Sequence, residues 1–472
     1  MFASAPPAAV SRPLAFDPAL IERLTQSGPR YSSYPTADQF VSSFGYRDYL
    51  KAVADLRTRG NARPLSLYLH IPFCESAGTD CAGTRTATRQ RDKAVVYLSY
   101  LKREIEMQGR LFVGMNQVEQ LYLGGGTPTC LSELQMGELM LQLRRNFQFA
   151  PDEAGEYTIQ VDPRSVTPER VHSLRRQGFN CINLNMDQDD PAVRTAASRV
   201  QAEAQTQALI GAAREANFHS VCIELIYGLP RQDLDSLEHT LATVVKAGPD
   251  RIALYNYAHL PSLSRPQRRS HDAALASADT RVAMLGLCLH TLEVAGYVYL
   301  GMDHFARPDD ELAIAQRQGR LHRNFQGYST HADLDLVSCG VSAVSSVGAT
   351  YSQNVKTLEA YYDRLDQNEL PIERGICLTM DDALRRALIQ MLMCQFELSI
   401  PAIEQAYPIS FAEYFAPELE KLAQLARDGL LTLDADWLSV TAKGRILIRH
   451  VCMVFDRYLG IAAGAARQPR IP

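Results

Sequence analysis

The 472-residue sequence lacks any apolar run of about eighteen residues, the length that a membrane-spanning helix requires. It also lacks an excess of charge, since the formal net charge is −5 and no block of like charges occurs. These two absences argue against a membrane span and against a nucleic-acid-binding protein. The first residues, MFASAPPAAVSRPLAF, show no basic start followed by an apolar core, so we expect no secretory signal.

Closely spaced cysteines are also scarce. The ten cysteines are scattered along the chain, and Cys74 and Cys81 form its one short-spaced pair. Several of the others lie within apolar strand or helix patterns, where a buried free thiol is the ordinary interpretation. This distribution argues against a disulfide framework and favours a reducing, cytoplasmic compartment.

The composition that remains is typical of a globular protein. With 46% hydrophobic and 21% charged residues, the chain can bury large cores. Its length predicts two or three structural units. We expect an N-terminal extension over residues 1–60, a main domain over 61–375 and a helical domain over 376–472. The sequence does not indicate an oligomeric state.

Six runs rich in β-forming residues alternate with amphipathic helical segments between residue 66 and about residue 300. This succession predicts a parallel sheet, either open or curled into a barrel. In such folds the functional residues gather at the carboxyl ends of the strands. The runs are 66–73, 118–126, 156–163, 180–186, 221–228 and 251–259.

Two further regions differ in character. Residues 300–375 are polar and rich in small residues, a pattern that suits close packing or a backbone-lined binding wall. From Thr379 the pattern reads helix, helix, β-ribbon, helix, which predicts a winged-helix-like module. Because this module shows no marked basic excess, we expect a scaffolding role for it rather than nucleic-acid binding.

Ten stretches carry a resemblance to a known family: RYSSYPTA, LYLHIPFC, LYLGGGTPT, DPRSVTPE, ELIYGLP, YNYAHLP, GMDHFARPDDELA, LHRNFQGY, GVSAVS and TAKGR. Together, from about Arg30 to about Leu459, they resemble oxygen-independent coproporphyrinogen III oxidase, also called coproporphyrinogen dehydrogenase. The resemblance implies an α/β fold, a partial (β/α)6 barrel of the radical S-adenosylmethionine (SAM) type. An N-terminal extension and a mostly helical, winged-helix-like C-terminal domain would flank this barrel.

The resemblance also implies the chemistry and its cofactors. A [4Fe–4S] cluster is held by three cysteines spaced CxxxCxxC, and its fourth iron binds SAM. Reductive cleavage of SAM gives a 5′-deoxyadenosyl radical, which starts the oxidative decarboxylation of coproporphyrinogen III to protoporphyrinogen IX. The implied partner is therefore coproporphyrinogen III or another tetrapyrrole.

Many positions match the family. Cys74 and Cys81 fall on the first and third cluster cysteines. Arg199 falls on an arginine that reaches the SAM carboxylate, a role suited to a fork of donors. The residues that match positions around SAM are Tyr68, Gly124, Gly125, Thr127, Arg199, Ala258, Phe325, Gln326 and Val344.

Other positions depart from the family. Gly78 stands where the second cluster cysteine belongs, and glycine has no side chain that can ligate iron. Three more changes affect SAM-site positions: Gln160 replaces a glutamate, Asp187 a glutamine and Glu224 an aspartate. These departures cluster at the predicted barrel mouth, whereas the scaffold motifs stay close to the family. We therefore interpret the chain as an oxidase scaffold that is defective in cluster and SAM binding.

Two alternatives stay open at this point. The first is an active coproporphyrinogen III oxidase. The second is a porphyrin- or haem-binding protein on the same scaffold, with His259, His304 and His322 as candidate ligands. A carboxylate-bound metal at Asp187 and its neighbours reads more simply as a solvated loop.

Overall fold

Six parallel strands form the centre of the protein. The computed structural model describes residues 14–24, 26–59, 63–74, 86–87, 91–115, 117–185, 196–257, 275–459 and 470–471. Within them, the six β-rich runs pair in sequence order and in parallel, which confirms the predicted α/β class. The strands are β2 (Leu65–Ile71), β5 (Val118–Gly125), β6 (Glu156–Val161), β7 (Cys181–Asn185), β8 (Ser220–Tyr227) and β9 (Arg251–Asn256).

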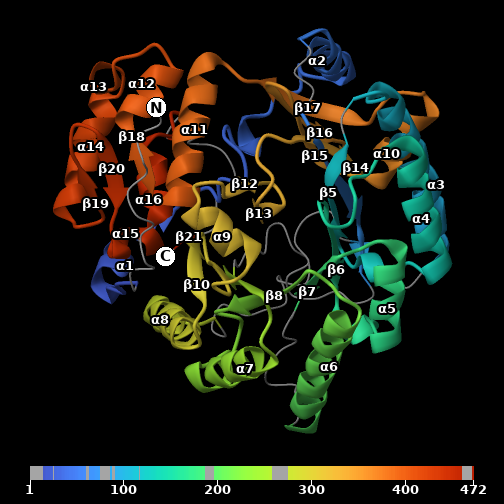
Figure 1. Cartoon of the computed structure of the whole chain (residues 1–472), viewed down its shortest axis with the longest axis horizontal. Helices are drawn as coiled ribbons and strands as arrows, with labels where there is room; N and C mark the ends of the chain where they lie inside the picture. The colour runs from blue at the N-terminus through green and yellow to red at the C-terminus, as the bar shows by residue number, and fades with distance from the viewer. Residues whose placement is uncertain are drawn as a thin grey trace.

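Helices cover the outer face of these strands (Figure 1). Their ends follow from local sequence signals: a capping box at Ser132 starts α4, and left-handed Gly178 and Gly248 end α5 and α7. The covering helices are α3 (Arg91–Leu111), α4 (Glu133–Asn146), α5 (Pro168–Gln177), α6 (Ala196–Glu215), α7 (Leu234–Ala247) and α8 (Ala278–Val294).

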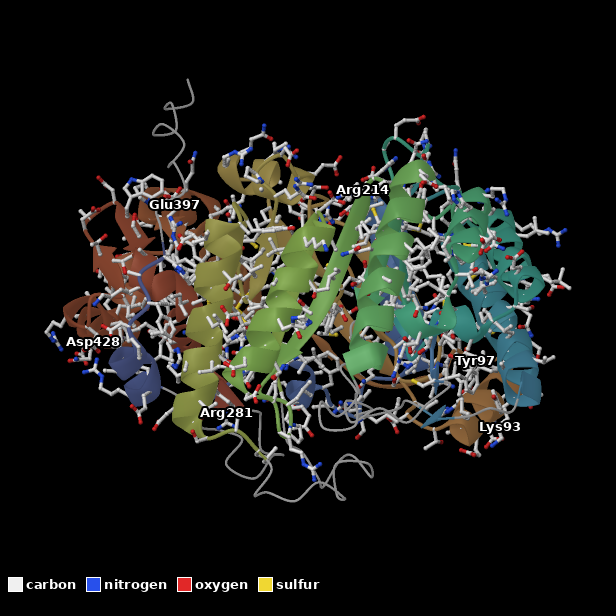
Figure 2. The ribbon with its side chains drawn as sticks, turned by 90° about the horizontal axis from the view of Figure 1, so that it is seen from below. Lys93, Tyr97, Arg214, Arg281, Glu397 and Asp428 are labelled. Atoms are coloured by element: carbon white, nitrogen blue, oxygen red, sulfur yellow. The ribbon has the colours of Figure 1, made fainter. Side chains whose placement is uncertain are left out.

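The direction of these helices identifies the mouth of the barrel. Figure 2 shows α6, α7 and α8 side by side. Lys93, near the start of α3, and Arg281, near the start of α8, lie at one edge of the molecule, whereas Arg214, near the end of α6, lies at the opposite edge. Since each helix starts after its strand ends, the edge with Lys93 and Arg281 is the one where the parallel strands end.

Shorter strands extend both edges of the sheet to twelve strands within the described residues. Beyond β2, β14 is parallel and β15 to β17 are antiparallel; beyond β9, β11 and β10 are antiparallel. The small-residue run in 339–351 thus forms sheet. The elements of this region are β10 (Val298–Gly301), β11 (His304–Ala306), α9 (Glu311–Arg317), β12 (His322–Asn324), β13 (Gly327–Ser329), β14 (Asp335–Cys339), β15 (Val344–Val347), β16 (Thr350–Asn354), α10 (Leu358–Asp366) and β17 (Ile372–Cys377).

The C-terminal part lies beside the barrel (Figure 1). Its helices flank a three-stranded antiparallel sheet in the order β18-β20-β19, as the helix and ribbon pattern predicts. Its elements are α11 (Met380–Gln395), β18 (Glu397–Ser399), α12 (Ile400–Ala406), α13 (Phe411–Tyr414), α14 (Ala416–Arg427), β19 (Leu431–Leu433), β20 (Trp437–Val440), α15 (Ala442–Ile446) and α16 (Ile448–Val454).

The N-terminal segment packs on this C-terminal part. The hydroxyl of buried Tyr31 donates to Asp456 Oδ2 at 3.0 Å, and the Tyr34 ring lies 6.0 Å from that of Tyr458. The remaining described elements are α1 (Pro18–Leu24), β1 (Gln26–Ser27), the short 3₁₀ turn η1 (Ala37–Gln39), α2 (Tyr46–Arg59), β3 (Phe73–Cys74), β4 (Thr86–Ala87), η2 (Pro128–Cys130), η3 (Pro163–Ser165) and β21 (Arg470–Ile471).

The parallel strands bury apolar side chains on one face and carry polar ones on the other. Leu121, Ile159 and Leu184 are fully buried in an apolar cluster that continues into the C-terminal part. The intervening residues, among them Tyr122 and Asn183, face the inside of the barrel, where they contact each other. No helix of the described residues is long and apolar enough to cross a membrane.

Candidate active site at the carboxyl ends of the strands

Backbone hydrogen bonds join the end of β2 and β3 to the glycine-rich end of β5. The amide of Gly126 donates to Ile71 O and that of Thr127 donates to Phe73 O, each at 2.6 Å. A Cβ at Gly126 would lie 2.2 Å from Phe73 O and 3.0 Å from Cys74 Sγ. The sulfur of Cys74, which is buried, therefore lies directly against this strand end.

Two glycines at this strand end are required by the packing of the protein itself. Gly125 has φ +109°, and a Cβ there would lie 2.8 Å from the His70 ring and from Ile71 O. A Cβ at Gly124 would lie 2.5 Å from the Tyr122 ring. Neighbouring groups of the protein, the His70 and Tyr122 rings and Ile71 O, therefore already occupy the space that the missing Cβ atoms leave.

A chain of polar contacts crosses the inside of the barrel. The hydroxyl of Tyr68 lies 3.0 Å from His70 Nδ1, and its ring stacks on Tyr122 with centroids 6.0 Å apart. Asn183 then bridges the next strands, because its Nδ2 donates to Tyr122 Oη at 3.0 Å and to Glu224 Oε1 at 2.9 Å. Five side chains from β2, β5, β7 and β8 thus form one continuous network.

Burial determines the protonation of this network. It raises the pKa of Tyr122 well above the ordinary value, and the nearby Glu224 carboxylate raises it further. The same two causes raise the pKa of Tyr255 on β9. Both phenols are therefore neutral at physiological pH, and each can donate or accept a hydrogen bond. Asn183 Oδ1 is buried without a hydrogen-bond partner in the described part of the chain.

The structure brings many of the predicted site residues together near the carboxyl ends of β2, β5, β6 and β8. Gln160, which is buried, lies on β6 with Oε1 3.4 Å from the position of a Cβ on Gly124. Glu224 joins the group through Asn183. The predicted residues that gather here are Tyr68, Cys74, Gly124, Gly125, Thr127, Gln160 and Glu224.

Other predicted residues lie apart from this network. The Gln326 amide donates to Ser66 Oγ at 3.0 Å, nearer the amino end of β2. The Phe325 ring packs edge-on against Tyr351 of β16, with centroids 5.7 Å apart, and Val344 opens β15. Arg199 belongs to α6, but its side chain lies outside the described residues, as do Gly78, Cys81, Asp187 and Ala258.

The candidate haem ligands divide between described and undescribed residues. His304 is partly buried with Nδ1 2.7 Å from Met302 O, and desolvation together with the charge of Arg323 lowers its pKa to about 3. Burial also lowers the pKa of His322. Both imidazoles are therefore neutral, whereas His259 lies outside the described residues.

Sequence reasoning did not single out Tyr122, Asn183 or Arg323. Tyr122 and Asn183 each lie inside a predicted strand, at alternate positions between apolar residues. Polar residues with that spacing in a strand that is buried on both faces indicate an interior site, and this signal was present in the sequence. For Arg323 the sequence carries no comparable signal, because its burial depends on packing between distant segments.

The residues present do not fit a cluster held by three cysteines. Of the three positions, Cys74 and Cys81 carry thiols and Gly78 carries no donor atom. Within the described ranges, no group of three or more His, Cys, Asp or Glu side chains is placed to hold a metal ion. These residues therefore do not provide the three thiolates that such a cluster requires.

Comparisons with known proteins agree with the geometry. Residues 69–244 match the Radical SAM superfamily, and residues 378–447 match the HemN C-terminal domain. The barrel and its strand-end site thus define a protein of the radical SAM class, whose enzymes use a [4Fe–4S] cluster and SAM.

The relatives identify the family within this class. The chain is 47% identical over 444 residues to the oxygen-independent coproporphyrinogen III oxidase of Escherichia coli, covering 94% of this chain and 96% of the relative. It is 46% identical over 446 residues to that of Pseudomonas aeruginosa, covering 94% and 96%. The solved structure of coproporphyrinogen III oxidase (HemN) from Escherichia coli aligns with a TM-score of 0.88 at 46% identity, covering 95% of this chain and all of that one. The chain belongs to the oxygen-independent coproporphyrinogen III oxidase family.

Proposed function

We propose that this chain keeps the scaffold of the family but neither assembles the radical-forming cluster nor cleaves SAM. Gly78 carries the proposal, because it occupies the position of the second cluster cysteine and offers no atom for ligation. Cluster irons in this class are held by cysteine thiolates, and two thiolates leave an iron without its protein ligand. Acid–base side chains do not replace the electron that SAM cleavage requires.

Changes at the SAM positions support the same proposal. Gln160 places a neutral amide where the family has a glutamate, and hydrogen bonds to charged groups are roughly twice as strong as neutral ones. Glu224 is one methylene longer than the family's aspartate, and its Oε1 already accepts a hydrogen bond from Asn183. Asp187 replaces a glutamine. We infer that these positions hold SAM less well than those of the relatives.

We further propose that the chain keeps the affinity of the family for a tetrapyrrole. The relatives are named for coproporphyrinogen III, and we propose that this chain still binds a molecule of that class. A reducing, cytoplasmic setting is part of the proposal. It is supported by the free thiols of the nine cysteines that the structure describes.

The second candidate is an active coproporphyrinogen III oxidase. It is favoured by the 47% identity over 94% of the chain, which extends well beyond the barrel mouth. This candidate requires that a ligand from outside the three family positions completes the cluster.

Anaerobic reconstitution separates the two candidates. The chain and its Escherichia coli relative are treated in parallel with iron and sulfide, and bound iron and released 5′-deoxyadenosine are measured. We expect substoichiometric iron and no 5′-deoxyadenosine from this chain. A full four-iron cluster with 5′-deoxyadenosine release would contradict the proposal.

Variants that restore the family residues show which change matters. We expect Gly78→Cys to raise the iron content without restoring SAM cleavage, and the added changes Gln160→Glu, Asp187→Gln and Glu224→Asp to restore part of it. Cys130→Ala serves as a control that leaves the iron content unchanged. Complete rescue by Gly78→Cys alone would show that the strand-end changes are tolerated.

A further inference from the structure

A buried arginine, Arg323, has no counter-ion among the residues that the structure describes. Arg323 lies on β12, opposite Tyr328 of β13, and only 8% of its surface is exposed. Its Cζ lies 4.7 Å above the centre of the Tyr328 ring. The main chain is held from the other side, since Gln390 Nε2 of α11 donates to Arg323 O at 2.6 Å. The side chain therefore occupies a defined position between the barrel and the C-terminal part.

The guanidinium of Arg323 has donors to spare. Its Nε and Nη1 are both buried, and neither has a hydrogen-bond partner in the part of the chain that the structure describes. No carboxylate among those residues pairs with it either. Buried arginines are almost always paired, because an uncompensated buried charge and unmet donors both destabilise the fold. A site that keeps such a group points to an anion that the described residues do not supply.

The surroundings of Arg323 are positive and aromatic. Burial lowers the pKa of His304 most, and the charges of Arg323, Arg449 and Arg30 lower it further, so the imidazole beside them stays neutral. Arg449 is neutralised by Asp303 at 2.8 Å, and the Arg30 guanidinium lies 5.7 Å from the centre of the Tyr255 ring. The neutral imidazole of His304 therefore does not compensate the positive charge of Arg323.

A series of ring contacts connects Arg323 to the carboxyl end of β9, although its hairpin also contacts Ser66 and Gln120 near the amino ends of β2 and β5. Tyr255 is the penultimate residue of β9 and packs edge-on against His304, which in turn packs edge-on against Tyr328. Arg323 thus lies next to Tyr328, the third ring of this series counted from Tyr255. The three rings place aromatic surface beside the cation.

We propose that Arg323 is a carboxylate-binding residue of this protein and that it takes a propionate carboxylate of a bound tetrapyrrole. A guanidinium presents two parallel N–H groups to a carboxylate, either from Nε and Nη2 or from Nη1 and Nη2. Nε and Nη1 of Arg323 each belong to one of these pairs, and both lack a partner among the described residues. The neighbouring rings suit the macrocycle that carries the propionate. The assignment rests on the proposed tetrapyrrole binding, and SAM, which also bears a carboxylate, is the other source of the same chemistry.

The test combines binding with the stability of the free protein. Purified wild type, Arg323→Met and Arg323→Lys are titrated with coproporphyrin III, followed by its Soret band, and separately with SAM by calorimetry. Arg317→Met, a change at the end of α9, is the matched control. We expect Arg323→Met to weaken coproporphyrin III binding at least tenfold, Arg323→Lys to weaken it less, and the control to bind like wild type.

The melting temperature of the ligand-free protein distinguishes a binding role from a structural one. Since Arg323 has no ion-pair partner among the described residues, we expect Arg323→Met not to lower this temperature. Unchanged coproporphyrin III binding in Arg323→Met, or no binding by wild type, would overturn the inference. A loss confined to SAM would assign the carboxylate to SAM and overturn the propionate assignment. Cluster content is measured separately, so a failure of the cluster proposal leaves this result readable.

Discussion

Glu104 of α3 shows how a single carboxyl group links distant segments. It is fully buried and accepts hydrogen bonds from Gly340 N at 2.7 Å, Asn354 Nδ2 at 2.8 Å and Tyr361 Oη at 2.5 Å. Burial nevertheless dominates and raises the pKa of Glu104 from 4.5 to about 7. The folded protein therefore binds this proton more tightly than the unfolded chain.

This shift makes stability depend on pH. Between about pH 4.5 and 7 the folded state holds more protons at Glu104 than the unfolded state, so the free energy of unfolding falls as pH rises. We expect Glu104→Gln to gain about 2–3 kcal/mol relative to wild type between pH 5 and pH 8. Urea denaturation at both values measures it. Glu106→Gln, an exposed position on the same helix, should show no such trend, and an equal trend in both variants would contradict the assignment.

Gly125, at the end of β5, is a position where a side chain should disturb the packing. A Cβ there meets the His70 ring and Ile71 O at 2.8 Å, and φ is +109°. We expect Gly125→Ala to lower the free energy of unfolding by about 3 kcal/mol. Gly211→Ala in α6, where nothing lies within 4 Å of the new Cβ, should instead stabilise by up to about 1 kcal/mol. Similar midpoints for the two variants in urea would refute the packing role.

At the scale of elements, the ion pair between Arg251 and Asp310 connects α9 to the sheet. Arg251 Nε at the start of β9 donates to both carboxylate oxygens of Asp310, at 3.1 and 2.9 Å, and both side chains are largely buried. Asp310 Oδ1 also caps α9 by accepting from Leu312 N at 2.8 Å. One carboxylate thus positions a strand and a helix together.

Removal of that carboxylate should be costly. We expect Asp310→Ala to destabilise by about 3–5 kcal/mol, because Arg251 would be left buried without its partner. Asp309→Ala, at the exposed neighbouring position, should change the free energy of unfolding by less than about 0.5 kcal/mol. Equilibrium denaturation of the two variants checks this, and a loss below about 1 kcal/mol for Asp310→Ala would contradict the structural role of the pair.

The elements differ in how far the sequence predicts them. The six parallel strands were predictable because β-rich runs alternate with segments of helical period. The strands that extend the sheet were not: β10 and β11, and likewise β14, β15 and β16, follow one another without the intervening helix that marks the strand–helix alternation. Their pairing depends on contacts between distant segments, which local patterns do not encode.

The candidate site divides in the same way. Tyr68 and Glu224 were predicted from resemblance to the family, and they lie in one network. Asn183, which connects Glu224 to the rest, was not predicted; its polar side chain within an apolar strand was visible in the sequence, but its partners depend on the register between β7 and β8. The unpaired state of Arg323 is likewise visible only once the fold is known.

At the scale of the whole molecule, the fold follows the family, whereas we expect the radical chemistry of the family to be lost. The barrel, the accessory strands and the C-terminal part follow the family over 95% of the chain, with a TM-score of 0.88. We propose that the changes at Gly78, Gln160, Asp187 and Glu224 fall at positions that serve the cluster or SAM in the family. We therefore expect a folded protein with tetrapyrrole affinity and no radical chemistry.

The most direct test of this account is the amount of 5′-deoxyadenosine that the reconstituted chain forms from SAM and a strong reductant under anaerobic conditions. The account predicts none above the protein-free background, while the Escherichia coli relative treated in parallel forms it readily. Release of 5′-deoxyadenosine by this chain at a rate comparable to that of the relative would contradict the account.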